Sequence, residues 1–280
     1  MNKDGMFVNG TDGLQCWDTS FVIQAIHACG GYMDKPEYKD MLVRALPFLE
    51  DQQIPENCTD QHKNYRQVRK GSWPFSKRNQ GYAVSDCTAE ALKAVLLLQS
   101  TPGYPQLIND RRIFDPVDVL LSMQSPDNGF SEYEPSRVGD WIESLNAAEV
   151  FRKIIKSYPF PECTTGVVTL KLFLANITPT PDYRVDDIRE VIRKSLIYIK
   201  SSQRQDGSWY SWGICFTYAA MFALETLEIL GETYENSHDV RRAANFLLSK
   251  QMSDGGWERV IRYPLFLFLF SPLLNRILNF

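Results

Sequence analysis

The sequence predicts an all-α protein, and three observations lead to that prediction. Apolar residues recur at about the helical period along most of the 280-residue chain. Asp, Ser, Thr or Gly stands at an end of most of these periodic segments, where such residues favour helix caps and stops. We find no convincing alternation of apolar and polar residues of the kind that is typical of a half-buried strand.

The first predicted helix covers residues 19–28, where Phe21, Val22 and Ile26 share one face, and it stops at Gly30-Gly31. The same periodicity predicts further helices along the rest of the chain. In order, these predicted helices cover residues 37–49, 88–99, 116–123, 147–156, 164–175, 185–201, 216–230 and 239–250.

A glutamine-to-aromatic motif repeats at the ends of several of these helices. Its members are Gln53 with Gly71-Ser72-Trp73 after an insertion, Gln124 with Phe130, Gln203 with Trp209, and Gln251 with Trp257. Turn residues such as Asp206-Gly207 separate each glutamine from its aromatic partner. We interpret the motif as structural, because a glutamine can bond backbone groups left open at a helix end while the ring packs beneath.

The repeats predict stacked helix pairs, arranged either as an open solenoid or as a closed ring of inner and outer helices. Four helices open with related sequences, which are Trp17-Asp18-Thr19, Asp86-Cys87-Thr88, Glu162-Cys163-Thr164 and Cys215-Phe216-Thr217. If these are the inner helices, their N-termini converge on one central cavity and direct their positive dipole ends toward it.

Composition excludes several classes of protein. The net charge is −4, with 30 basic and 34 acidic residues, so no basic surface suggests nucleic acid. The six cysteines form no C-x-x-C pair and His27, His62 and His238 do not cluster, which makes a zinc site unexpected. No signal peptide opens the sequence, and we expect reduced cysteines on the cytosolic side.

Asp86 is the candidate catalytic residue. Its position at the start of a helix suggests an N-cap when spacing alone is considered. However, the run Val84-Ser85-Asp86-Cys87-Thr88-Ala89-Glu90 resembles the catalytic signature of the oxidosqualene cyclases. The glutamine repeats resemble those of the same family, as do the runs at residues 17–21, 66–71 and 212–218. The resemblance extends from about residue 4 to 257 and is greatest to fungal members that form lanosterol or protostadienol.

The resemblance implies an α/α toroid, a ring of inner and outer helices, which is incomplete here. It also implies that Asp86 protonates the epoxide of 2,3-oxidosqualene, which starts a cascade of cyclising carbocations without a cofactor or a metal. Cys87 and Cys163 are expected beside Asp86 as hydrogen-bond donors that tune its acidity. The aromatic residues that match the family's cation-stabilising cavity are Trp17, Phe75, Tyr133 and Trp212.

The signature also indicates which substrate is protonated. Squalene-hopene cyclases, which protonate an alkene, resemble this chain but carry a D-x-D-D run where it has Val84, Asp86 and Cys87. A single carboxyl suits an epoxide, whose oxygen is far more basic than an alkene. Apolar surroundings are expected to keep Asp86 protonated until it acts.

We expect residues 1–257 to form a partial α/α-toroid catalytic domain of a triterpene cyclase and residues 258–280 to form an aberrant apolar tail. The amino-terminal portion of family members has no counterpart in this sequence. That portion includes a histidine that the resemblance implies acts late in the cascade. The run at residues 209–212 is one residue shorter than usual. The tail is short against the ~20 residues of a spanning helix. It reads as a membrane segment, an interfacial anchor or, the interpretation we favour, a misread intron or frameshift.

The resemblance further implies a monotopic protein on the cytosolic side of the endoplasmic reticulum membrane or of a lipid droplet. Alternatives remain open at this point. The repeats alone are compatible with a non-catalytic helical-repeat binding module, and the missing ends with an inactive pseudogene product. A zinc prenyltransferase subunit shares the helical ring, but no histidine accompanies Asp86-Cys87 as that site requires.

Overall fold

A computed structural model of the chain describes residues 13–146, 155–176, 183–211 and 216–257. The helices, in chain order, are α1 (Gln15–Cys29), α2 (Pro36–Gln52), η1 (Arg78–Gln80), α3 (Ser85–Ser100), α4 (Asp110–Ser122), η2 (Asp140–Leu145), α5 (Pro161–Thr164), α6 (Gly166–Asn176), α7 (Val185–Ser202), α8 (Phe216–Ile229) and α9 (His238–Ser249). Within the described ranges β pairing is limited to isolated bridges, as at Gln124 and Phe130. The all-α prediction is confirmed.

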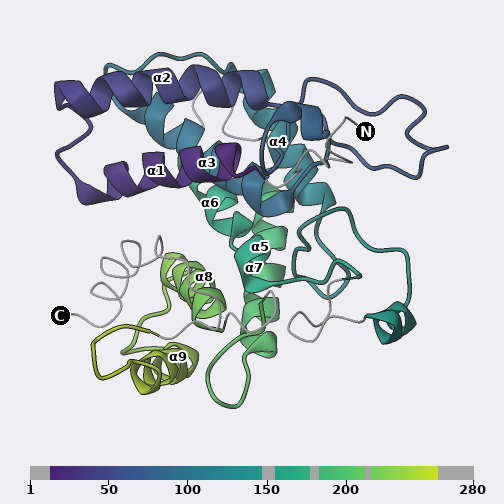
Figure 1. Cartoon of the computed structure of the whole chain (residues 1–280), viewed down its shortest axis with the longest axis vertical. Helices are drawn as coiled ribbons and strands as arrows, with labels where there is room; N and C mark the ends of the chain where they lie inside the picture. The colour runs from purple at the N-terminus through teal and green to yellow at the C-terminus, as the bar shows by residue number, and fades with distance from the viewer. Residues whose placement is uncertain (1–12, 147–154, 177–182, 212–215, 258–280) are drawn as a thin grey trace, which may run out of the picture.

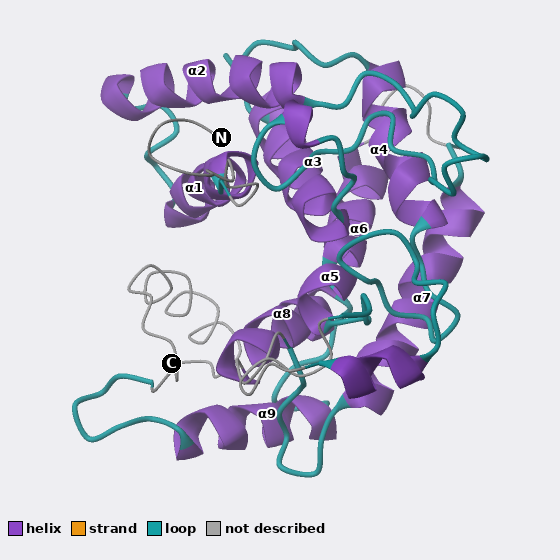
Figure 2. Cartoon of the chain, turned by 45° about the vertical axis from the view of Figure 1, so that its right-hand side comes forward, coloured by secondary structure: helices purple, strands orange, loops and turns teal. Residues whose placement is uncertain are grey.

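The helices form two curved layers. Figure 2 shows α1, α3, α5, α6 and α8 on the inner side of an open arc, with α2, α4, α7 and α9 outside them. Each outer helix packs on an inner one, in the pairs α1·α2, α3·α4, α6·α7 and α8·α9, and neighbouring inner helices contact one another from α1 through α3 and α6 to α8. In Figure 1, α5, α6 and α7 join the half that holds α1–α4 to the half that holds α8 and α9.

Most predicted helices agree with the structure to within a few residues, and the differences have local causes. The helix predicted at 164–175 is divided at Thr165, where the backbone tightens and the Val168 amide donates to the Thr165 carbonyl at 2.8 Å. The helix predicted at 147–156 lies mostly outside the described residues, and residues 155 and 156 are a bend instead.

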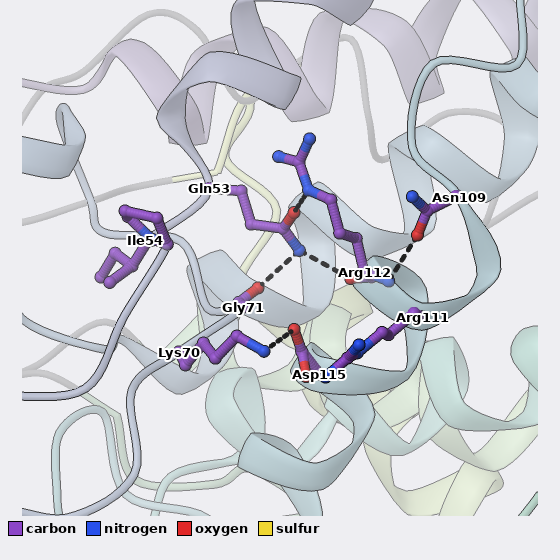
Figure 3. A pocket seen from close by; sticks show the side chains of 9 residues that line it. Gln53, Ile54, Lys70, Gly71, Asn109, Arg111, Arg112 and Asp115 are labelled. Carbon is purple, nitrogen blue, oxygen red and sulfur yellow. Dashed lines mark hydrogen bonds and ion pairs between the residues drawn. The ribbon is translucent and has the colours of Figure 1, made fainter.

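The glutamine motif closes each helix pair in the predicted way. The indole nitrogens of Trp73, Trp209 and Trp257 each donate at 2.7 Å to a carbonyl at the end of the preceding helix. The glutamine amide reaches the turn, as Gln53 Nε2 does to the Gly71 carbonyl at 2.9 Å (Figure 3). Gln124, Gln203 and Gln251 make the same bond to the carbonyls of Asn128, Gly207 and Gly255. The structural interpretation of the repeats is therefore confirmed.

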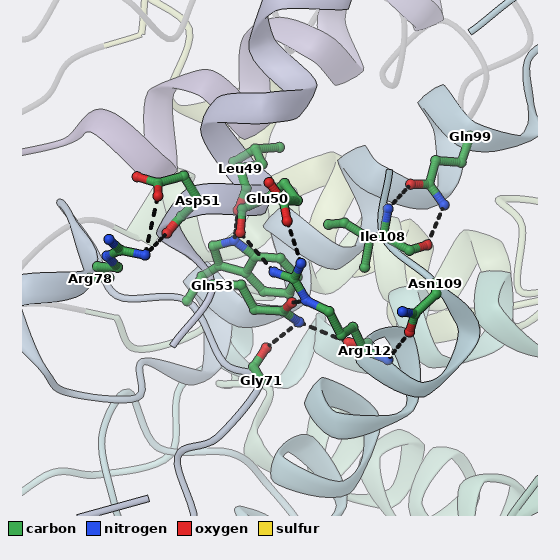
Figure 4. A network of polar contacts seen from close by, with 11 residues as sticks. Leu49, Glu50, Asp51, Gln53, Gly71, Arg78, Gln99, Ile108, Asn109 and Arg112 are labelled. Carbon is green, nitrogen blue, oxygen red and sulfur yellow. Dashed lines mark hydrogen bonds and ion pairs between the residues drawn. The ribbon is translucent and has the colours of Figure 1, made fainter. Parts of the chain in front are cut away.

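The predicted start of α4 at Pro116 was wrong, and Gln53 explains how proline is tolerated inside the helix. Helix α4 begins six residues earlier, after Asn109, whose side chain accepts the Arg112 amide. Pro116 has no N–H to donate to the Arg112 carbonyl, four residues back. Gln53 Nε2 donates to that carbonyl instead, at 2.8 Å, and Arg112 Nε returns a bond to Gln53 Oε1 at 2.9 Å (Figure 4).

Replacing Gln53 by alanine is expected to destabilise the fold by about 1–3 kcal/mol, because the buried Gly71 carbonyl and the part-buried Arg112 carbonyl lose their donor. The control is Gln251→Ala, since Gln251 is exposed and its side-chain amide bonds the Gly255 carbonyl four residues further on. That change is expected to stay within about 0.5 kcal/mol. Urea unfolding followed by circular dichroism measures both, and equal losses would contradict the bridging role of Gln53.

Candidate active site

Asp86 is the second residue of α3, and its side chain does not cap the helix. The N-cap position is Val84, which has no side-chain capping bond, so the N-cap interpretation was wrong. The Asp86 carboxyl instead lies beside the first turn, where backbone N–H groups have no partner within the helix. Its Oδ1 accepts the amide of Cys87 at 2.8 Å.

Burial and hydrogen bonding act on the Asp86 carboxyl in opposite directions. The residue is only 8% exposed, and burial outweighs the hydrogen bonds, so the net effect raises its pKa from 3.8 to about 6. Bonds from the backbone and thiol of Cys87 and from the thiol of Cys163 lower the pKa in part. Cys163 Sγ lies 3.9 Å from Asp86 Oδ2, so the structure brings the two predicted neighbours of Asp86 to its carboxyl.

A short segment between α4 and α5 brings Cys163 to this position. The Phe130 amide donates to the Thr164 hydroxyl at 3.1 Å, and the Phe130 carbonyl accepts from the Phe160 amide at 3.1 Å. Two residues later, the Glu132 carbonyl accepts from the Ser85 amide at 2.8 Å. Residues 130–133 therefore connect the start of α3, which carries Asp86, to the start of α5, which carries Cys163.

Two of the predicted cavity aromatics pack together in a cluster with the neighbour of Asp86. The rings of Trp17 and Phe75 have centroids 5.7 Å apart, and Trp17 lies 4.6 Å from Phe21 edge to face. Both belong to a cluster that includes Cys87, the residue next to Asp86. The full cluster is Trp17, Phe21, Phe75, Val84, Cys87, Tyr218, Met221 and Phe222.

The remaining predicted positions differ in what the structure shows. Burial raises the phenol pKa of Tyr133, followed by the charge of Glu132 and a hydrogen bond to that carboxyl, and the charge of Asp86 adds a smaller effect. The Tyr133 ring stands edge to face with Tyr82. Tyr133 is more exposed than Trp17, at 36% against 8%. Trp212 lies outside the described residues, as does the 258–280 tail.

Sequence reasoning missed several residues of this site. Phe222 and Tyr218 of α8 join the cluster, and their rings lie 5.0 Å apart. Their spacing of four residues near the start of an inner helix was the available signal. Glu132 was also missed, and burial followed by the charge of Asp86 raises its pKa to about 8. An acidic residue directly before Tyr133 was the signal in that case.

Two further properties of the described residues complete the description of the site. No group of three or more His, Cys, Asp and Glu side chains in this part of the chain is arranged to hold a metal ion. Among the described helices, none combines the length and apolar character needed to cross a bilayer. What distinguishes the site is a buried carboxyl with thiol neighbours, beside packed aromatic rings.

Solved structures show which class this arrangement represents. The ent-copalyl diphosphate synthase from Streptomyces platensis superposes with a TM-score of 0.54 at 18% identity, over 95% of this chain and 44% of that one. A type II terpene cyclase from Scytonema, solved with geranylgeranyl dihydroxybenzoate, gives a TM-score of 0.52 at 13% identity, over 88% and 57%. The helical arc is thus the α/α toroid fold of terpene cyclases.

Comparison of amino-acid sequences identifies the family of the chain, which the fold alone does not. The chain belongs to the squalene-hopene cyclase C-terminal domain family, whose model matches residues 15–263. It is 55% identical to lanosterol synthase erg7A of Aspergillus fumigatus over 258 residues, and 47% identical to human lanosterol synthase over 263 residues. Each match covers 92% of this chain and about a third of the relative, 34% and 35%. The resemblance to oxidosqualene cyclases is confirmed, and the chain spans about a third of the length of these relatives.

Proposed function

We propose that this chain supplies the proton-donating part of an oxidosqualene cyclase site. Asp86 gives its proton to the epoxide oxygen of 2,3-oxidosqualene, and the C–O bond opens as neighbouring double bonds attack. The cascade ends when a proton leaves the last cation, so the reaction is a net isomerisation to a sterol-type triterpene such as lanosterol or protostadienol. The observation that carries this proposal is the buried Asp86 carboxyl with Cys163 Sγ at 3.9 Å.

The surroundings of Asp86 suit a donor of one proton. Burial keeps the carboxyl protonated at a higher pH than usual, since a charged form is poorly solvated there. Once the proton leaves, the amide of Cys87 and the thiol of Cys163 stabilise the carboxylate that remains. The side chains at the other signature positions, Val84 and Cys87, are buried and carry no second carboxyl, which favours the more basic epoxide over an alkene.

The aromatic cluster supports the second half of the reaction. A ring face attracts a cation by ~1–2 kcal/mol or more when water is excluded, and it offers no lone pair that would trap the intermediate. We assign this role to Trp17, Phe75 and Tyr133, and by sequence resemblance to Trp212. Phe21 and Phe222 extend the same surface, with ring centroids 6.5 Å apart.

The substrate also suggests where the protein acts. A long hydrocarbon epoxide partitions into lipid, so the cyclase needs access to a membrane. We propose peripheral or monotopic binding to the cytosolic side of the endoplasmic reticulum or of lipid droplets. Flotation with phosphatidylcholine vesicles tests this, and a chain that stays at the bottom of the gradient would contradict it.

A chimera tests the activity, because the chain matches only about a third of the length of its relatives. This chain replaces the matching third of the Aspergillus fumigatus lanosterol synthase, and the unaltered relative is the positive control. We expect the chimera to cyclise 2,3-oxidosqualene and to leave squalene unchanged, with products identified by gas chromatography and mass spectrometry. A chimera that unfolds as cooperatively as the relative yet converts no oxidosqualene would overturn the proposal.

A further inference from the structure

We propose that Thr165, at the junction of α5 and α6, is a positioning residue that aligns the aromatic cluster with Asp86 and so influences which product the cyclisation yields. The inference rests on the proposed function, because only a cyclase has a cascade whose course depends on where aromatic rings stand. Thr165 acts through Phe222, whose backbone it bonds, and not on the substrate.

The junction that carries Thr165 is fixed against α3, the helix that carries Asp86. Two residues before Thr165, Cys163 Sγ lies 3.9 Å from Asp86 Oδ2. The residue after Thr165 is Gly166, and a methyl group on Gly166 would stand 3.2 Å from Cβ of Ala89, so the two helices approach closely there. These contacts before and after Thr165 fix its backbone relative to the acid.

The Thr165 hydroxyl reaches the neighbouring inner helix, α8. It lies 3.0 Å from the Phe222 carbonyl and 3.1 Å from the Thr226 hydroxyl, which is itself 3.0 Å from that carbonyl. A hydroxyl has one proton to donate. The Pro161 carbonyl, 2.9 Å from the Thr165 hydroxyl, already accepts the Thr165 amide at 2.8 Å. We therefore assign the Thr165 proton to the Phe222 carbonyl, with Thr226 donating to Thr165.

Burial gives this contact its importance. Thr165 and Thr226 are fully buried and Phe222 is 1% exposed, so no water replaces a bond that is lost. A buried carbonyl that loses its donor is costly, and the chain relieves the cost by shifting the backbone toward another donor. Removal of the Thr165 hydroxyl is therefore expected to move α8 near Phe222 relative to α5.

Phe222 links this bond to the aromatic cluster. Its ring lies edge to face with Tyr218 at 5.0 Å between centroids and with Phe21 of α1 at 6.5 Å. Phe21 in turn lies 4.6 Å from Trp17. The Phe222 backbone thus sets how the rings of α8 stand relative to those of α1. Because a ring face attracts only a cation that lies close to it, a shift of these rings relative to Asp86 changes which intermediate is stabilised.

A fluorine probe tests the positioning in the full chain without substrate. 4-Fluorophenylalanine replaces Phe222 alone, and its ¹⁹F resonance is recorded with threonine, valine or serine at residue 165. Valine has the shape of threonine but no hydroxyl, so we expect Thr165→Val to shift or broaden the resonance beyond its original linewidth. Thr165→Ser keeps the hydroxyl and is expected to leave the resonance near its original position.

Thr169→Val is the matched control. Thr169 is also fully buried, and its hydroxyl donates to the Ala89 carbonyl at 3.0 Å, so it joins α6 to α3 and not to α8. The change removes the same group from the same kind of contact between inner helices, and we expect the fluorine resonance to stay within its linewidth. An unmoved resonance in Thr165→Val, or an equal shift in Thr169→Val, would overturn the inference.

The chimera measures the consequence for the product. We expect Thr165→Val to raise incompletely cyclised by-products at least about fivefold relative to the main product, with a smaller loss of total conversion. Thr165→Ser is expected to restore the product pattern, and Thr169→Val to leave it unchanged. A pattern unaltered by Thr165→Val would contradict the influence on product. A chimera with no activity would count against the proposed function alone, and the fluorine measurement would then decide the positioning role.

Discussion

Replacing Asp86 by asparagine in the chimera is expected to reduce conversion of 2,3-oxidosqualene by at least ~10³-fold. A positioned acid contributes ~10²–10⁴-fold in many enzymes, and an amide of the same shape has no acidic proton to give. Asparagine keeps an oxygen that can accept the Cys87 amide, so the first turn of α3 is expected to be preserved. The measurement is turnover of labelled 2,3-oxidosqualene at saturating substrate.

The stability of the same variant separates loss of chemistry from loss of fold. The Asp86 pKa is raised, so the folded state binds this proton more tightly than the unfolded state does. This carboxyl therefore favours folding most at low pH, and that contribution declines between pH 4 and pH 6. A rise from 3.8 to about 6 corresponds to roughly 3 kcal/mol. Asp86→Asn in the full chain is thus expected to be more stable at pH 7, and the gain is expected to vanish below pH 4.

Asp18→Asn is the matched control for both measurements. Asp18 stands in the first turn of α1, another inner helix, and follows Trp17, but its side chain is exposed. We expect this change to leave turnover within about twofold and stability within about 0.5 kcal/mol. Unaltered turnover by Asp86→Asn, or equal losses in the two variants, would remove Asp86 as the acid.

The helices that were predicted well are those whose signals are local. Helices α2, α7 and α9 each bury one stripe of side chains, so their periodicity and end residues are visible in the sequence. Helix α4 began earlier than predicted because Pro116 sits inside it, opposite a carbonyl that Gln53 bonds from another helix pair. This hydrogen bond comes from a residue that is distant in the sequence, so no sequence pattern near Pro116 predicts it.

The site could be predicted only in part for a similar reason. Asp86, Cys87 and Cys163 came from the resemblance, since 77 positions separate Asp86 from Cys163 and periodicity does not pair them. The segment that carries Glu132 is held against the first turn of α3 by a backbone bond from the Ser85 amide to the Glu132 carbonyl. A backbone bond does not depend on side-chain type, so the sequence does not indicate that this segment lies against the start of α3.

A charged network next to the site was also invisible in the sequence, and it joins three inner helices. Lys93 of α3 lies 2.6 Å from Glu225 of α8 and 3.9 Å from Glu90, one turn after Asp86. Glu90 in turn accepts Gln24 Nε2 of α1 at 2.6 Å. Burial alone lowers the Lys93 pKa, but the charges of Glu225 and Glu90 outweigh it and raise the pKa. Lys93 therefore stays charged between the two carboxylates.

Replacing Lys93 by methionine is expected to destabilise the full chain by about 3–5 kcal/mol at pH 7, because Glu90 and Glu225 are left without their cation. Urea unfolding measures the loss, and the double variant with Glu225→Gln is expected to recover part of it. Lys194→Met is the control, since Lys194 pairs with Glu190 on the surface and is expected to cost at most ~0.5 kcal/mol. Lowering the pH is expected to reduce the loss of unfolding free energy caused by Lys93→Met. Burial raises the pKa of Glu90, so Glu90 takes up a proton and no longer needs the cation. A loss no larger than that of Lys194→Met would show that this network does not hold α1, α3 and α8 together.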